Sequence, residues 1–409
     1  MTELLDRSGA FPCLPSLTGL RFAAALLVYF THLSVEGYLA PGPAAAVFRY
    51  AFGLGWLGVE FFFILSGFVL TWSARPGDSR THFWRRRLVK VFPTHLTTWL
   101  AALLLALAAG ELLTTARLLP SFFLLNAWFP DLDVMRAVNL PSWSLSVELA
   151  FYLAFPWLRA LTGRIRPERL WAWAWGVAVT IALLPFLADH AFPSDPRLPG
   201  LEMTLTQNWF LMALPAVRAL DFVLGILLAR IVLSGRWAGP GLPGAAALVA
   251  AGAAAQLALV PTVYGLSAAL ALPLALFVAA AARADMTGAP SPFRGPAAVW
   301  LGETSFAFYM THHLVLHYVR LALGETRVWS VPEVAALGVL LLAVTIGVSW
   351  LVHRLVEAPA MRRWSRPAAR GERPERVPAG ASPADARLTS RPPRRAEQGL
   401  AVRRSPARR

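Results

Sequence analysis

The sequence predicts an all-α integral membrane protein with about ten transmembrane helices in one bundle and both termini in the cytoplasm. Of its 409 residues, 56% are hydrophobic and 15% are charged, a composition outside the soluble range. Apolar runs of about 17 to 25 residues, the length needed to cross a bilayer, recur along the chain. The arginine content of the connections alternates, as the positive-inside rule requires of a multi-pass protein.

Ten apolar runs have the length of a membrane span. In chain order they cover about 17–38, 54–74, 92–110, 143–161, 170–188, 209–233, 241–260, 262–282, 297–321 and 333–356. Basic residues follow the even-numbered runs, whereas the other connections are poorer in arginine and often acidic. The two alanine-rich runs hinged at Pro261 either span the membrane twice or form a re-entrant hairpin, and the sequence leaves both arrangements open.

The basic charge of the chain is concentrated at its C-terminus. Beyond Met361 there are fourteen arginines and four acidic residues, which account for ten of the fifteen net positive charges. We therefore expect a transmembrane domain over 1–364 and a disordered, arginine-rich cytoplasmic tail over 365–409 that lies near anionic lipid head groups, with no nucleic-acid partner. The acidic residues at the start of the chain indicate that the first helix is retained and is not a cleaved signal peptide. We expect the protein in the cell (plasma or inner) membrane.

The chain contains a single cysteine, Cys13. One cysteine excludes an internal disulfide framework and a cysteine metal site. We predict no metal site from the sequence.

Arg21 and His32 are the most informative polar residues, because both lie in the first apolar run. They are eleven positions apart, so they lie within roughly 20° of one helical face, with Cα atoms ~16 Å apart along the axis. An ionisable group inside a membrane faces a partner or a water-filled cavity and indicates a functional site. The alternative is that His32 only forms a hydrogen bond to a neighbouring helix.

Other runs carry ionisable groups at a similar predicted depth. If the first helix enters from the cytoplasm, His32 lies ~22 Å into a hydrocarbon core ~30 Å thick. The alternating topology brings Glu60, Glu148, His312 and His313 to the same outer layer. Each could separately be a polar contact between helices, but their common depth predicts one shared cavity.

A basic cluster, HFWRRRLVKVFP, lies at the cytoplasmic end of the third run. Positive-inside anchoring explains it without any ligand. A phosphate site is the sharper hypothesis, because arginine binds phosphate through two parallel hydrogen bonds and Arg21 opens onto the same side of the membrane. The candidate phosphate ligands are Arg21, Arg86, Arg87 and Lys90.

Six segments together resemble the membrane acyltransferase family 3, a family of multi-pass O-acyltransferases. In order they are LTGLRFAAALLVYFTHL, GVEFFFILSGFVLT, RRLVKVFP, PSWSLSVELAFYLAFP, SFAFYMTHHLV and HRLVEAPAMRR. They occur on matching predicted helices, over about Leu14 to Trp364. Three positions depart from the family pattern, since Lys90, Glu60 and Phe306 replace the more usual arginine, aspartate and tyrosine.

The resemblance implies roles for particular residues. Arg21 and His32 correspond to the essential pair of the family, Glu148 to the acid of its Trp-Ser-Leu-Ser-Val-Glu segment, and His312 to its late histidine. His32 and Glu148 are the candidate catalytic residues. Further candidate site residues are Glu60, Ser66, Trp143, Ser146, Tyr309, His312 and His313.

The predicted function is transfer of an acyl group, acetyl or another short chain, from acyl-CoA to a sugar hydroxyl on a glycan or glycosylated natural product. The acyl-CoA donor is implied by the resemblance, and an extended pantetheine arm is of the same order of length as the ~16 Å between Arg21 and His32. His32 would act as general base or carry a transient acyl group. The alternative is a multi-pass transporter in which the same charges form a substrate or proton path.

Overall fold

The computed structural model describes residues 12–74, 77–198, 202–259, 268–324 and 326–365. These residues belong to one compact unit, Met1–Arg366. Every regular element within them is a helix, which confirms the all-α class. Apart from Ser365, the predicted tail lies outside the described residues, so the tail and the domain boundary at 364 stay predictions.

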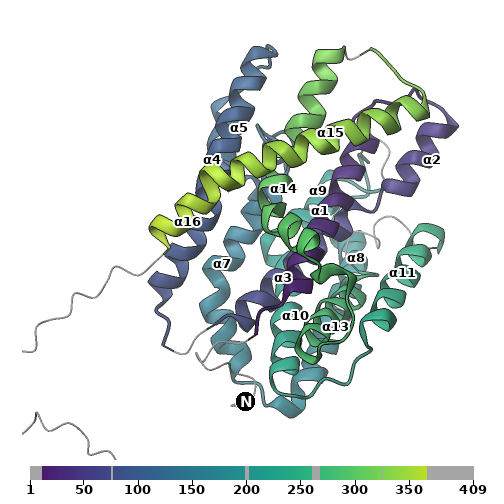
Figure 1. Ribbon diagram of the computed structural model, residues 1–409. Helices are drawn as coiled ribbons and strands as arrows, with labels where there is room; N and C mark the ends of the chain where they lie inside the picture. Colours follow the sequence, from purple (N-terminus) through teal and green to yellow (C-terminus); the bar gives the residue numbers. More distant parts are fainter. Residues whose placement is uncertain (1–11, 75–76, 199–201, 260–267, 325, 366–409) are drawn as a thin grey trace, which may run out of the picture. The chain divides into compact units, whose positions relative to one another are not determined.

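Helices follow one another along the described part of the chain, and Figure 1 shows how the labelled ones are arranged. They are α1 Pro15–Val35, α2 Pro43–Phe52, α3 Gly55–Trp72, α4 Arg80–Ala108, α5 Thr115–Phe122, η2 Asn126–Trp128, α6 Leu132–Met135, α7 Ser142–Gly163, α8 Leu170–Ala191, η4 Trp209–Ala213, α10 Pro215–Leu233, α11 Leu242–Leu259, α13 Ala271–Thr287, α14 Pro296–Leu323, α15 Val331–Val352 and η6 His353–Glu357. The short helices η3 Pro167–Arg169, α9 Leu205–Asn208, η5 Pro292–Arg294 and α16 Ala358–Trp364 complete it.

Each of the ten predicted spans overlaps one of these helices. Among the described residues, five helical segments are long and apolar enough to cross a membrane by length and composition. They are Pro15–Val35, Pro43–Trp72, Arg80–Ala108, Pro167–Ala191 and Val331–Trp364. The count of ten crossings and the cytoplasmic termini therefore stay predictions. Pro261, the predicted hinge between α11 and α13, lies outside the described residues, and both arrangements of this pair remain open.

Close helix packing at the centre is made possible by glycine. Helix α1 packs against α3 and α14, and α3 packs against α10. A Cβ atom on Gly302 of α14 would lie 1.9 Å from the carbonyl oxygen of Thr18 in α1, and one on Gly67 of α3 would lie 2.0 Å from that of Phe222 in α10. Small residues at such crossings let helix backbones approach closely, as in membrane bundles.

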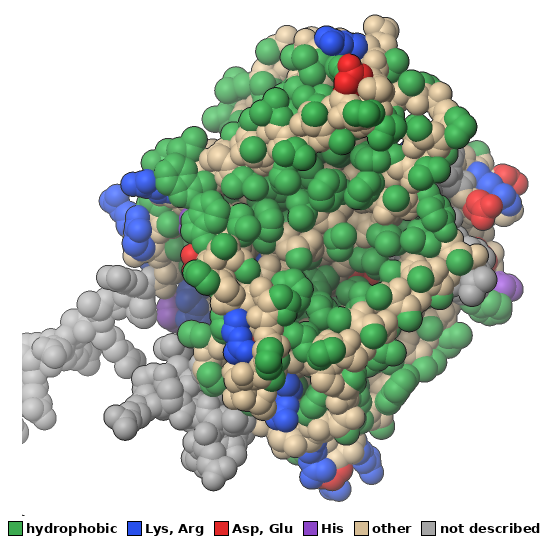
Figure 2. Space-filling model, turned by 45° about the vertical axis from the view of Figure 1, so that its right-hand side comes forward, with side chains coloured by type: hydrophobic (Ala, Val, Ile, Leu, Met, Phe, Trp, Pro, Cys, Tyr) green, Lys and Arg blue, Asp and Glu red, His purple; other side chains and the backbone are tan. Residues whose placement is uncertain are grey.

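The outer helices present apolar side chains to their surroundings. Leu104 of α4, Leu183 of α8 and Val339 of α15 are each 58–69% exposed. Figure 2 shows hydrophobic side chains spread over much of one face, with lysine and arginine in its lower part and at its edges. An apolar surface of this kind is suited to lipid, and it supports the assignment to the membrane.

Candidate active site

The centre of the site is a pair of histidines from two packed helices. Nδ1 of His32, near the end of α1, lies 2.8 Å from Nε2 of His312 in α14. The two rings are stacked with centroids 5.0 Å apart, and the ring of His313 meets His32 edge-on at 5.2 Å. His312 is fully buried, whereas His32 is partly exposed. The structure thus brings His32, His312 and His313, three of the residues predicted at one depth, into contact.

Hydrogen bonding fixes which nitrogen of His32 can accept a proton. Nδ1 of His312 lies 2.7 Å from the carbonyl oxygen of Tyr309, and a carbonyl can only accept, so this nitrogen donates. In a neutral ring, Nε2 of His312 is then an acceptor, and His32 donates to it from Nδ1. Nε2 of His32 keeps its lone pair and forms no hydrogen bond within the described residues. This arrangement is suited to a general base.

A second polar group surrounds Glu148 of α7. Its carboxylate accepts hydrogen bonds from Ser66 of α3 at 3.2 Å and from the hydroxyl of Tyr152. Glu148, Arg21 and Tyr309 line a small cavity of about 50 Å³. Tyr309 connects the two groups, because it lines this cavity while its carbonyl accepts the bond from His312. Its hydroxyl lies 2.7 Å from that of Ser144, another lining residue.

The four basic residues predicted to bind phosphate differ in how they are paired. Within the described residues, Arg21 and Arg87 form no ion pair, and the buried Nε atom of each has no hydrogen-bond partner. They lie within electrostatic range of each other and of Glu148. The Arg87 guanidinium lies 5.9 Å from the ring centroid of Tyr152. The structure thus places two unpaired guanidinium groups beside the Glu148 cavity.

The other two basic residues already have acidic partners. Arg86 forms an ion pair with Asp78, which also lies 3.1 Å from His82. The Arg86 hydrogen bond holds the pKa of the Asp78 carboxyl below its usual range, so the pair is ionised at neutral pH. Lys90 pairs with the buried Glu357 of η6. Of the four residues predicted to bind phosphate, Arg86 and Lys90 therefore each have an acidic partner. Arg21 and Arg87 have none within the described residues.

Three predicted site residues take other positions. Glu60 of α3 is fully buried, and its charged neighbours are Arg218 and Asp221 of α10, not the histidines. Trp143 packs in a hydrophobic core, and the hydroxyl of Ser146 accepts a hydrogen bond from the Ala127 backbone. These three residues therefore lie apart from the histidines. The polar residues predicted to share one cavity form separate groups in the structure. The short helix containing Ala127, held by Ser146, was not expected from the sequence.

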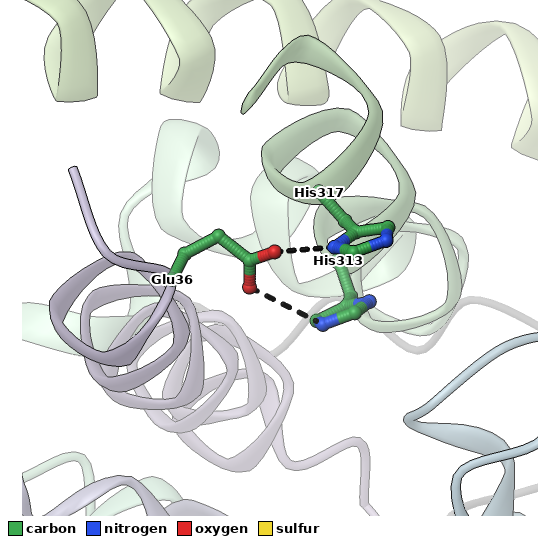
Figure 3. Close-up of side chains that lie close together, drawn as sticks. All are labelled: Glu36, His313 and His317. Carbon is green, nitrogen blue, oxygen red and sulfur yellow. Dashed lines mark hydrogen bonds and ion pairs between the residues drawn. The ribbon is translucent and has the colours of Figure 1, made fainter. Parts of the chain in front are cut away.

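The sequence reasoning missed an acidic partner of the histidines. Glu36 follows the last turn of α1, and its carboxylate oxygens lie 3.6 Å from Nε2 of His313 and 2.5 Å from Nδ1 of His317 (Figure 3). Two patterns in the sequence could have identified this group. Glu36 is four residues after His32, and His317 is four residues after His313, so each pair lies on one helical face.

The comparisons with known proteins show a similarity to acyltransferases. Residues 14–354 match the family described as an acyltransferase domain, acyltransferase 3. The chain is 41% identical over 362 residues to acyltransferase MdmB of Streptomyces mycarofaciens, covering 86% of this chain and 93% of that protein. It is 26% identical to nodulation protein 10 of Rhizobium leguminosarum bv. viciae, over 84% and 92% of the two chains.

A longer relative matches over a shorter stretch. The peptidoglycan O-acetyltransferase OatA of Listeria monocytogenes is 29% identical over 159 residues, 35% of this chain and 23% of that protein. No solved structure matches the chain.

Proposed function

The chain belongs to the acyltransferase 3 family and is an acyltransferase, and from this we propose that it moves a short acyl group, such as acetyl, from acyl-CoA to a sugar hydroxyl. Family membership decides between an enzyme and a transporter in favour of the enzyme. The similarity to O-acetyltransferases supports oxygen as the acceptor atom, and the peptidoglycan relatives support a sugar-containing acceptor at the cell membrane.

The observation that carries the mechanism is the hydrogen bond between His32 and His312. Because it leaves the lone pair of His32 on Nε2, this nitrogen can remove the proton of an acceptor hydroxyl. The hydroxyl oxygen then bonds to the thioester carbonyl carbon, the carbon–sulfur bond breaks, and CoA leaves as a thiolate that takes up the proton from His32. His312 is a positioning residue in this scheme.

A covalent route uses the same nitrogen. Nε2 of His32 would first bond to the thioester carbonyl carbon as the carbon–sulfur bond breaks and CoA leaves as a thiolate. The acceptor hydroxyl would then attack that carbon, the carbon–nitrogen bond would break, and the freed imidazole would take up the hydroxyl proton. The two routes differ in one observable, because only the covalent route leaves an acyl adduct on His32 when the acceptor is omitted. Mass spectrometry of peptides containing Val28 to Leu33 distinguishes them.

The donor site is built around Arg21 and Arg87. Buried guanidinium Nε atoms without partners fit the phosphate oxygens of CoA, which accept charge-assisted hydrogen bonds. Phosphates held at Arg21 would place the far end of an extended pantetheine arm near His32, since ~16 Å separates the two positions along α1. The cavity beside Glu148 lies along this path.

The direct test uses the purified protein with acetyl-CoA and a panel of sugar acceptors, including peptidoglycan fragments and glycosylated natural products. We expect release of free CoA that depends on the acceptor, together with a product heavier by one acetyl group. Acyl transfer from an acyl-carrier protein but not from acyl-CoA would overturn the donor assignment. Uptake of an unmodified compound into proteoliposomes without acylation would overturn the enzyme.

A further inference from the structure

We propose that Glu36, His313 and His317 form a binding site for a divalent transition metal, and that Zn²⁺ is the ion best suited to it. One candidate donor atom from each residue lies within 4.8 Å of the other two. Figure 3 shows the carboxylate of Glu36, the residue after the last turn of α1, facing both imidazole rings of α14. The sequence argument against a metal concerned only cysteine ligands, and this donor set contains none.

The donor types and spacing match a zinc site. Two histidines at i and i+4 of one helix and a carboxylate from another element supply three protein ligands, the number found in zinc sites that keep an open fourth position. With zinc bonds of about 2.1 Å, tetrahedral donors are separated by about 3.4 Å. The three donor atoms are within roughly 1.5 Å of that separation, a difference that rotation of the partly exposed side chains can supply.

A further carboxylate supports the assignment. Nε2 of His317 lies 3.8 Å from Glu111, on the side of the ring away from the nitrogen that faces Glu36. Tyr318 donates a hydrogen bond to the same Glu111 carboxylate at 3.4 Å. Histidines that bind metals usually donate their second ring N–H to a carboxylate, which fixes the ring and strengthens the ligand. His317 is placed in this way, because one of its ring nitrogens faces Glu36 at the proposed site and the other faces the Glu111 carboxylate.

The site is also accessible. Glu111 and His317 line an open cavity of about 770 Å³ between the ends of α4 and α14, which gives an entry path for an ion and room for a water molecule at the fourth position. The ring of His313 meets that of His32 with centroids 5.2 Å apart. A bound ion would therefore join α1 to α14 immediately beside the proposed general base.

The experiment measures bound metal directly and does not depend on acyl transfer. The full chain is purified without a polyhistidine tag, loaded with Zn²⁺, passed through a desalting column and analysed by inductively coupled plasma mass spectrometry. We expect about one zinc per chain. The Co²⁺-loaded protein should show the visible absorption bands of a tetrahedral complex, which an ion pair between Glu36 and the histidines would not produce.

Variants separate this site from adventitious binding. Glu36→Gln and His317→Gln should each weaken Zn²⁺ binding by roughly 100-fold or more, because one of three protein ligands is lost, and Glu111→Gln by about 10- to 100-fold. His190→Ala, which removes an exposed histidine at the end of α8, is the matched control and should bind zinc as the parent does. Substoichiometric zinc in the parent, or equal zinc in the parent and Glu36→Gln, would overturn the proposal.

Discussion

At the scale of single residues, His312 determines which nitrogen of His32 is basic. His312→Asn keeps a carbonyl acceptor for Nδ1 of His32, whereas His312→Phe removes it, so that the proton of a neutral His32 ring is no longer held on Nδ1. Losing this partner costs about 1–3 kcal/mol and lowers the fraction of His32 with a free lone pair on Nε2, so we expect kcat to fall roughly 10- to 100-fold in His312→Phe and less in His312→Asn. Steady-state kinetics at saturating acyl-CoA measures the difference. Equal activity in both variants would show that a hydrogen-bond acceptor at position 312 does not contribute to catalysis.

Arg86 and Arg87 are adjacent in sequence but differ in their partners, which makes them a matched pair. Arg87→Ala should raise the KM for acyl-CoA by about 10- to 100-fold, the value of a charge-assisted hydrogen bond, with little change in the KM for the acceptor. Arg86→Ala removes a group already paired with Asp78 and should have a much smaller effect on the donor KM. The opposite order would show that Arg86, not Arg87, contacts the donor.

The sequence predicted a common depth for His32 and His312, because their positions along two apolar runs set that depth, but the contact between their rings is seen only in the structure. It could not predict how the basic cluster is paired. Asp78 lies just before α4, so its pairing with Arg86 depends on where that helix begins, which the apolar pattern did not show. Glu357 lies in a short helix far along the chain, so its pairing with Lys90 depends on tertiary structure. Glu60 was predicted at the level of the histidines, but depth says nothing of direction, and its charged neighbours are on α10.

At the scale of helices, the histidine pair depends on how closely α1 approaches α14. Gly302→Ala would bring a Cβ atom within 1.9 Å of the Thr18 backbone and force the helices apart. We expect this variant to lose most activity and to unfold at a lower temperature, as measured by thermal unfolding in detergent. Gly347→Ala in α15 is the control, because a Cβ there meets nothing within 4 Å. Equal effects of the two variants would contradict the packing argument.

Helix positions were more predictable than helix ends. Each of the ten apolar runs overlaps a helix of the described residues, since lipid requires long continuous apolar segments. Helix α4 begins at Arg80, about one dozen residues before the predicted start, because the Ser79 hydroxyl caps its first turn by accepting a hydrogen bond from the backbone of His82. The apolar pattern could not show this extension, since its first turns are basic. They bring Arg86 and Arg87 onto a helix.

At the scale of the whole molecule, the mechanism requires Arg21 at the cytoplasmic side and His32 toward the outside. Reporter fusions at Ala46 and Asp195 should therefore be outside, and fusions at Asp78 and Arg283 inside, as the positive-inside pattern predicts. Protease protection or an alkaline phosphatase reporter makes the measurement. A reversed pattern would place the donor site on the side of the membrane without acyl-CoA.

The most direct test of the account is the activity of His32→Ala, measured together with its affinity for acyl-CoA in the same preparation. A correctly placed general base contributes roughly 10²- to 10⁴-fold, so kcat should fall by about that factor while acyl-CoA binding, which rests on Arg21 and Arg87, is nearly unchanged. A His32→Ala protein that folds, inserts and turns over at the parental rate would show that this histidine only joins two helices and is not the base.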